Sequence, residues 1–171
     1  QPYNRFSGCQ YICATIYILL IDSLQNTGKI LYYNYDSSIP SSTCCFNSDM
    51  VLYSKLRPYL NKVVLPNKTG YATSELVPLN PVNGKLNKYF LAYLLRSKCF
   101  VDDINVRVAG AKMPRVSMDY LRSFPVILPP IEEQKEIVAK IEAEQALIEP
   151  NKQIIEVFSK KIQDRINEIF Q

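Results

Sequence analysis

The sequence predicts an α+β fold, with a globular domain over residues 1–128 and a long helical segment over residues 129–171. In the globular part, short apolar runs rich in Ile, Val, Tyr and Thr alternate with turn signals, as expected for strands. Apolar residues recur at helical spacing over residues 87–100. Beyond residue 130, isoleucine recurs at every seventh position, which is typical of a long pairing helix.

The first half of the chain is predicted to be mostly strands and turns. Its longest apolar run, residues 11–21, is shorter than the roughly 20 residues of a membrane-spanning helix, so we interpret it as a buried strand. A loop rich in Ser, Pro and Thr is expected over residues 37–47. Further strands are predicted at residues 29–33, 50–54, 61–65 and 71–79.

The second half is predicted to be mainly helical. Apolar residues share one face over residues 87–100, and a shorter helix is expected to begin at Ser117, a favoured N-cap residue type. A short apolar strand over residues 126–128 then leads through two prolines into the long helix. Pro130 suits the first position of that helix, and the acidic residues that follow oppose the positive end of its dipole.

The long helix is predicted to carry a coiled-coil seam, because a seven-residue apolar repeat kept over this length favours helix pairing. The seam consists of Ile141, Ile148, Ile155, Ile162 and Ile169, with Phe158 beside it. Pro150 interrupts the helix, and an internal proline costs about 3 kcal/mol. Either one helix continues with a kink, or a second helix begins at Pro150; the unbroken isoleucine register favours one helix.

The composition excludes several kinds of catalytic site. The chain has no histidine, which excludes Ser/His/Asp and Cys/His nucleophiles, and it has no glycine-rich phosphate loop. Its five cysteines lack the spacing of a zinc ribbon or finger, so we expect buried free thiols. We therefore expect a cytoplasmic, non-catalytic protein without a membrane segment, a metal or a cofactor of its own.

Three segments resemble the specificity subunit of type I restriction–modification systems. Residues 49–63 resemble the family pattern GDVLxSxxRPYLxK, with Ser48 where glycine is usual. Residues 110–117, with Leu121 after them, resemble the GxxxPRIS turn, and residues 128–134 resemble the segment that opens the long helix. The preceding residues are less diagnostic, as expected if that part varies with the DNA sequence it reads.

The resemblance implies a target-recognition domain, the DNA-reading component of a multisubunit methyltransferase and endonuclease. Its partners would be double-stranded DNA, methyltransferase subunits and possibly restriction subunits, with S-adenosylmethionine bound by the methyltransferase subunit. Family members usually carry two recognition domains, each followed by a long helix, whereas this chain has one such unit. It would then be a half-subunit that pairs as a homodimer through its helix, or a fragment of a longer chain.

Under this interpretation, DNA binding rests on basic and polar side chains. The basic residues in or near the first two segments are predicted to hold phosphates: Lys55, Arg57, Lys62, Arg107, Lys112 and Arg115. Tyr35 is predicted to present its hydroxyl in a groove. The alternatives are hydrogen bonds from Arg57 and Arg115 to the backbone of their own loops, and packing of the tyrosines within a sheet.

Two other functions are compatible with the sequence. The chain could be the C-terminal recognition segment of a fused, single-chain methyltransferase–endonuclease, which would be established by methyltransferase motifs upstream of Gln1. It could also be a coiled-coil adaptor that does not bind DNA. The adaptor predicts little salt dependence, whereas a DNA reader with about five phosphate contacts predicts a log–log salt slope of about −4.5.

Overall fold

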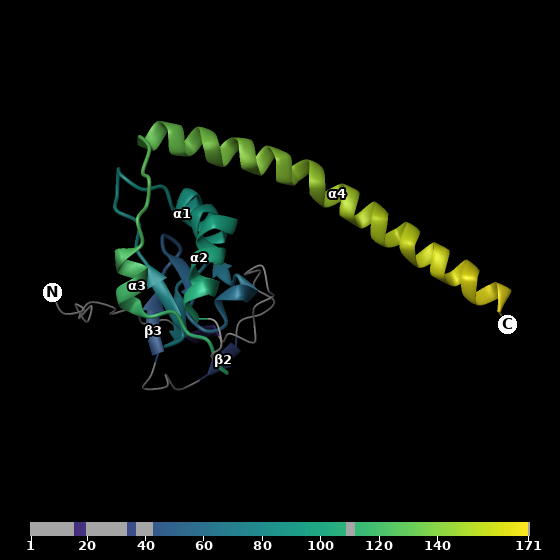
Figure 1. Cartoon of the computed structure of the whole chain (residues 1–171), viewed down its shortest axis with the longest axis horizontal. Coiled ribbons are helices and arrows are strands. Elements are labelled where there is room, and N and C mark those ends of the chain that lie inside the picture. Colours follow the sequence, from purple (N-terminus) through teal and green to yellow (C-terminus); the bar gives the residue numbers. More distant parts are fainter. Residues whose placement is uncertain (1–15, 20–33, 37–42, 109–111, 171) are drawn as a thin grey trace.

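The computed structural model describes residues 16–19, 34–36, 43–108 and 112–170. Within these residues, two β-sheets and the short helices α1 to α3 form a body, and one long helix, α4, projects from it (Figure 1). The predicted α+β fold with a long C-terminal helix is therefore confirmed. None of the described helices combines the length and apolarity needed to cross a membrane.

The first sheet has four strands in the order β2-β1-β6-β3. These are β1 (Ile16–Leu19), β2 (Asn34–Asp36), β3 (Thr43–Phe46) and β6 (Gly70–Thr73). The pairings are antiparallel except for β1 with β6, which is parallel. The end of the expected loop over residues 37–47 is thus a strand, because β3 pairs along its whole length with β6. The strand expected at residues 29–33 lies outside the described residues.

The second sheet is antiparallel, with the order β5-β4-β7. Its strands are β4 (Val51–Ser54), β5 (Val63–Val64) and β7 (Leu76–Leu79), and the short 3-10 helix η2 (Pro58–Leu60) connects β4 to β5. The single strand predicted over residues 71–79 is wrong. A turn at Ser74 and Glu75 divides it into β6 and β7, which belong to different sheets.

The predicted helix over residues 87–100 is two helices, α1 (Lys88–Arg96) and α2 (Lys98–Val108). They separate at Ser97, whose backbone is extended (ψ 145°) and whose hydroxyl accepts a hydrogen bond from the Phe100 amide at 3.3 Å. Ser97 therefore ends one helix and caps the next. Helix α3 (Met118–Ser123) begins after Ser117, as predicted, and the Ser117 hydroxyl accepts a hydrogen bond from Tyr120 N at 3.2 Å.

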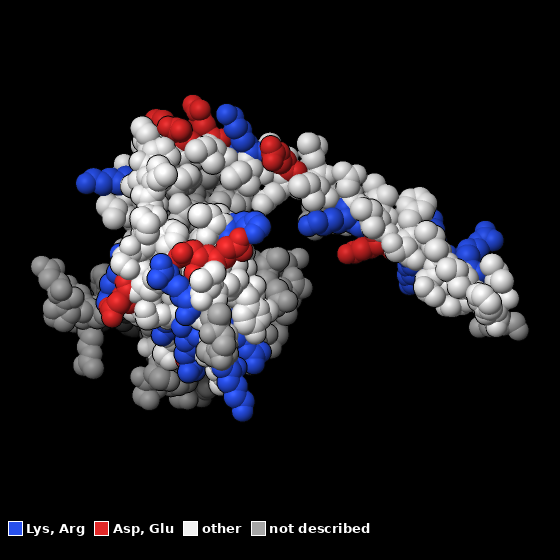
Figure 2. All heavy atoms as spheres, viewed as in Figure 1, with Lys and Arg blue, Asp and Glu red and all other residues white. Residues whose placement is uncertain are grey.

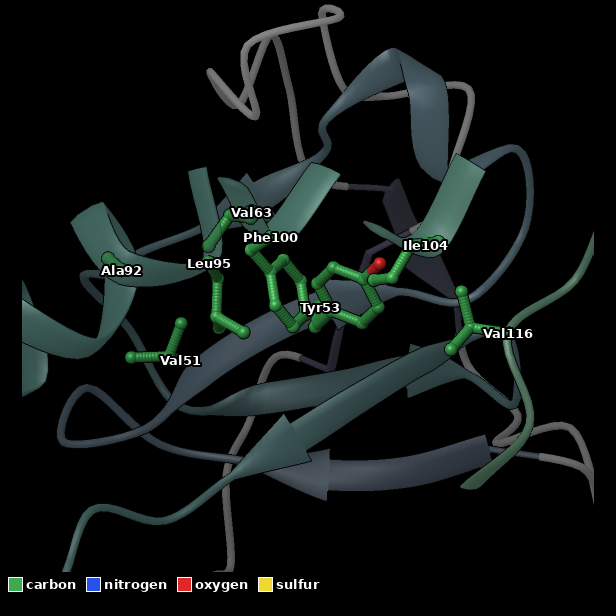
Figure 3. Close-up of a cluster of buried hydrophobic side chains, with 8 residues drawn as sticks. All are labelled: Val51, Tyr53, Val63, Ala92, Leu95, Phe100, Ile104 and Val116. Carbon is green, nitrogen blue, oxygen red and sulfur yellow. The ribbon is translucent and has the colours of Figure 1, made fainter. Parts of the chain in front are cut away.

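The core occupies both faces of β4, because successive side chains of a strand point to opposite faces. Val51 and Tyr53 face the helices, whereas Leu52 faces the four-stranded sheet. The helix-side cluster is Val51, Tyr53, Val63, Ala92, Leu95, Phe100, Ile104 and Val116 (Figure 3). The cluster between the sheets is Phe46, Leu52, Val64, Ala72 and Leu76. The three-stranded sheet is therefore the middle layer of the body.

Helix α4 runs without a break from Ile131 to Ile169 and contains Pro150, so the one-helix alternative is confirmed. Next to the proline, the Asn151 side-chain amide donates a hydrogen bond to Leu147 O at 2.8 Å, which supports the helix where Pro150 lacks an N–H. The strand predicted at residues 126–128 is wrong. These residues have no regular structure and lie exposed before α4, because they pair with none of the described strands.

Candidate nucleic-acid interface

Backbone hydrogen bonds join the two basic segments that the sequence singled out, although almost sixty residues separate them. Leu56 and Arg115 form an isolated antiparallel bridge. On one side of it, Arg57 N donates to Pro114 O at 2.9 Å, and on the other, Val116 N donates to Lys55 O at 3.0 Å. The bridge holds the backbones of the two segments side by side on the body.

In Arg57, the backbone has a structural role, whereas the side chain is exposed to solvent. Its backbone has φ 50°, a left-handed conformation that is uncommon for a residue other than glycine. Its N–H bonds Pro114 O, and its carbonyl accepts a hydrogen bond from Leu60 N, each at 2.9 Å. Within the described residues, the exposed guanidinium makes no hydrogen bond or ion pair. The expected structural alternative thus applies to the backbone of Arg57 and leaves its side chain available.

Arg115 is oriented by Glu75, which comes from the turn between β6 and β7. Its guanidinium lies 3.0 and 3.3 Å from the two carboxylate oxygens of Glu75. The Glu75 side chain is 25% exposed and the Arg115 side chain 54%, so the acid is the fixed partner and the base is presented to solvent. The sequence analysis missed Glu75, because a lone acid forty residues from its partner gives no local signal.

Arg107 lies over an aromatic ring at the end of α2. Its guanidinium carbon is 4.4 Å from the centre of the Tyr120 ring, within the range of a cation–π contact, and its Nε is 3.3 Å from Asp103 Oδ2. Arg107, Arg115 and Tyr120 line an open hollow of about 430 Å³, with Ile104, Val108, Val116 and Ser117. The hollow is therefore walled by two guanidinium groups that come from different elements.

Tyr120 contributes an unusual atom to this region. Its hydroxyl is buried and has no hydrogen-bond partner within the described residues. Leaving a buried polar group unpaired costs about 1–3 kcal/mol. Because the residue borders an open hollow with two guanidinium groups, a ligand oxygen bound there could supply the missing partner.

The other residues predicted to bind DNA differ in how far they are exposed. Lys112 is exposed, and Lys55 is half-buried beside the bridge. Lys62 is buried, with 8% of its surface exposed, so it lacks the exposure expected of a phosphate contact. Tyr35 lies in β2 opposite Tyr17 of β1, and its side chain lies outside the described detail.

The charged side chains are unevenly distributed over the body. Lys and Arg side chains gather over the lower part of the body in Figure 2, acidic side chains lie among and above them, and both signs occur at the start of α4 and along it. The acids of the first turn of α4, Glu132 and Glu133, occupy the positive end of its dipole. A concentration of one sign of charge attracts a polyanion over distances longer than a contact.

The cysteines form no candidate metal site within the described residues. Cys44 and Cys45 are both half-buried, and burial raises the pKa of the Cys44 thiol, whose Sγ lies 3.3 Å from Leu76 O. Cys99 is free but exposed, because it lies on the outer side of α2; the expectation of burial is wrong for this residue. Cys9 and Cys13 lie outside the described residues.

The predicted seam of α4 is largely uncovered. Ile141, near the body, is half-buried, but the later seam residues are exposed by 49–77%: Ile148, Ile155, Phe158, Ile162 and Ile169. Single apolar residues are commonly exposed on protein surfaces, but a continuous apolar row over several heptads is rarely exposed. This row is the part of the molecule that a partner helix would cover.

The fold and this surface define a class of protein, an α+β domain with exposed basic side chains carried on a long helix. The chain belongs to the family of type I restriction modification DNA specificity domains, whose family model matches residues 15–159. The resemblance noted in three sequence segments is therefore confirmed.

Relatives agree with this assignment. Over 118 residues, the chain is 30% identical to the type I restriction enzyme EcoDI specificity subunit of Escherichia coli, a match that covers 68% of this chain and 26% of that protein. Thus the chain spans about a quarter of the length of this curated relative.

Two solved structures share the fold. One is the HsdS subunit from Thermoanaerobacter tengcongensis, with a TM-score of 0.71 and 24% identity. The other comes from work on complex assembly and conformational transition of the type I R-M system, with a TM-score of 0.73 and 23% identity. Each match covers 82% of this chain and 38% of the solved chain.

Proposed function

We propose that this chain is a non-catalytic module that recognises one half of a bipartite DNA target. The observation that supports this most strongly is the Leu56–Arg115 bridge, which joins two distant segments that both carry exposed basic side chains. Arg57, Arg107, Lys112 and Arg115 would hold phosphates and set the register on the duplex, with Lys55 beside them. Base edges would be read from loops next to this surface.

The helix α4 would provide the second half of the function. Its exposed isoleucine row would pair antiparallel with the same row of a second copy, or of a second tandem unit, so that two recognition domains act together. Methyltransferase subunits, and possibly restriction subunits, would dock on the helix and the body. The methyltransferase would bind S-adenosylmethionine and methylate a flipped adenine, while this chain supplies the target specificity.

Membership of the specificity-domain family favours this proposal over an adaptor that does not bind DNA. The test is selection of bound duplexes from a random pool at moderate salt, with the chain alone and with a cognate methyltransferase subunit. We expect an interrupted palindrome for a paired module and one short motif for a single unit. No enrichment under either condition would contradict the recognition function.

The phosphate contacts are tested by the salt dependence of binding. With about five contacts, the slope of log K against log salt should be near −4.5, and Arg115→Gln should reduce its magnitude by about 0.9. Lys140→Gln on α4 is the matched control, since it removes one exposed positive charge away from the body's basic surface. Equal slopes for Arg115→Gln and the wild-type chain would exclude Arg115 as a phosphate contact.

A further inference from the structure

Gln134 is the one fully buried polar side chain that the described part of α4 contains. It lies in the first turn of this helix, where its neighbours are exposed acids and a lysine. All the hydrogen-bonding groups of its amide are used within the described structure. Oε1 accepts a hydrogen bond from Asn87 N at 2.9 Å, and Nε2 donates to Lys85 O and Pro129 O at 2.9 and 2.8 Å.

These bonds fasten α4 to two other segments of the chain. Asn87 is the N-cap of α1, and its side chain accepts hydrogen bonds from Tyr89 N and Phe90 N. Pro129 ends the exposed segment before α4, and Lys85 lies in the loop before α1. One amide therefore fixes the start of α4 against the start of α1. A hydrophobic residue of the same size would leave three backbone groups unpaired.

The rest of the attachment is short. Val138, one turn later, is buried, and the Tyr93 hydroxyl of α1 donates to Gln145 Oε1 at 3.1 Å in an exposed contact. Beyond it, the described side chains of α4 are exposed. The free part of the helix is thus a long lever. With a rise of about 1.5 Å per residue, a tilt of about 10° at the base would move its far end by about 10 Å.

We propose that Gln134 is a positioning residue that sets the direction in which α4 leaves the body, and thereby the distance between paired recognition domains. The spacing part of this inference rests on the proposed function, whereas the direction of the helix does not. When two such helices are paired along their seams, a loose attachment would let each body turn on the end of its helix, so the separation of the two half-sites would vary. A defined spacer requires a defined base.

The test is a distance measurement in the full chain. Spin labels are placed on the exposed Cys99 of α2 and on Gln163→Cys of α4, with the other cysteines replaced by serine. In Gln134→Glu, one carboxylate oxygen can still accept the hydrogen bond from Asn87 N. The NH2 group, which donates two hydrogen bonds, is replaced by a second oxygen that can only accept and that faces carbonyl oxygens. We expect the distance distribution to broaden or shift by about 10 Å at neutral pH.

Lowering the pH should narrow this distribution again, because a protonated carboxyl regains one donor. Gln145→Glu is the control, since its carboxylate still accepts the Tyr93 hydroxyl and its distribution should match the parent chain at each pH. A Gln134→Glu chain that is less stable but keeps the parent distribution would overturn the proposal, since the residue would then only stabilise the fold.

Two further readouts separate the possible failures. Hydrogen exchange on the unmodified chain needs no folded variant: the Asn87 amide should be as protected as the core, and rapid exchange would contradict the anchor. Duplex selection with Gln134→Glu should return several spacer lengths where the parent returns one. If the parent selects no DNA, the proposed function fails, but the distance measurement still decides whether Gln134 sets the direction of α4.

Discussion

The side chain of Tyr120 has a ring that makes stabilising contacts and a buried hydroxyl that has no hydrogen-bond partner among the described residues. Its ring supports Arg107 and packs edge-to-face near Phe124, with the ring centres 6.0 Å apart. Its hydroxyl, in contrast, is buried without a partner among the described residues. Strained or unsatisfied groups persist where the surrounding structure or a ligand compensates for them. The ring of Tyr120 therefore stabilises the fold, whereas its unpaired hydroxyl costs stability.

Replacing Tyr120 with phenylalanine should separate these two effects. Because Tyr120→Phe keeps the ring and removes only the unpaired hydroxyl, we expect the free energy of unfolding to rise by about 1 kcal/mol in urea. Binding of DNA should weaken if a phosphate oxygen pairs with this hydroxyl in the complex. Tyr93→Phe removes a paired, exposed hydroxyl and should change stability by less than about 0.5 kcal/mol. A loss of stability in Tyr120→Phe would show that the hydroxyl is satisfied.

At the scale of elements, α4 presents an apolar row that its own body does not cover. Seven residues separate the seam isoleucines Ile148 and Ile155 on the two sides of Pro150, so the proline leaves the register of the row intact. Most of the stability of a helix in a protein comes from packing its apolar face, and this helix packs only its first turns on α1. A partner helix would therefore stabilise the greater part of α4.

Self-association should depend on this row and not on exposed apolar surface in general. We expect the double substitution Ile155→Asn with Ile162→Asn to shift a dimer to monomer in sedimentation equilibrium, because both residues lie in the seam. Val157→Asn is the control, since this side chain is as exposed but lies off the seam. If the wild-type chain stays monomeric at every concentration, the seam would pair with a tandem unit and not with a second copy. If the dimer survives both substitutions, the seam would be excluded as the dimer interface.

Elements with a local signal were predicted from the sequence, and elements defined by distant contacts were not. The cap at Ser117 and the continuity of α4 follow from residue type and period. Ser97 has the same capping chemistry, but the apolar spacing on both sides of it concealed the break between α1 and α2. Nothing local indicates the ion pair of Glu75 or the contact of Gln134 with α1, because those partners lie about forty and fifty residues away.

At the scale of the whole molecule, the described residues form a body from which the long helix α4 projects. The 39 residues of α4 span about 58 Å, which is less than two turns of duplex DNA at about 34 Å each. Two copies paired antiparallel through a twofold axis would place their bodies at opposite ends of the paired helices. The basic surfaces would then face two half-sites in inverted orientation, and the length of the helix would determine the number of base pairs between them.

A change in the length of α4 should therefore change the number of base pairs between the two half-sites by a predictable amount. Inserting one heptad between Ile155 and Ile162 keeps the seam in register and adds about 10.5 Å, so the selected spacer should lengthen by about three base pairs. Inserting two residues is the control, because at about 100° per residue it turns the later seam residues to the opposite side of the helix and should abolish pairing and not merely shift the spacer. Both chains are compared by selecting duplexes from a pool of fixed half-sites with varied spacers. Half-sites that keep their original spacing after the heptad insertion would mean that α4 does not separate the recognition domains.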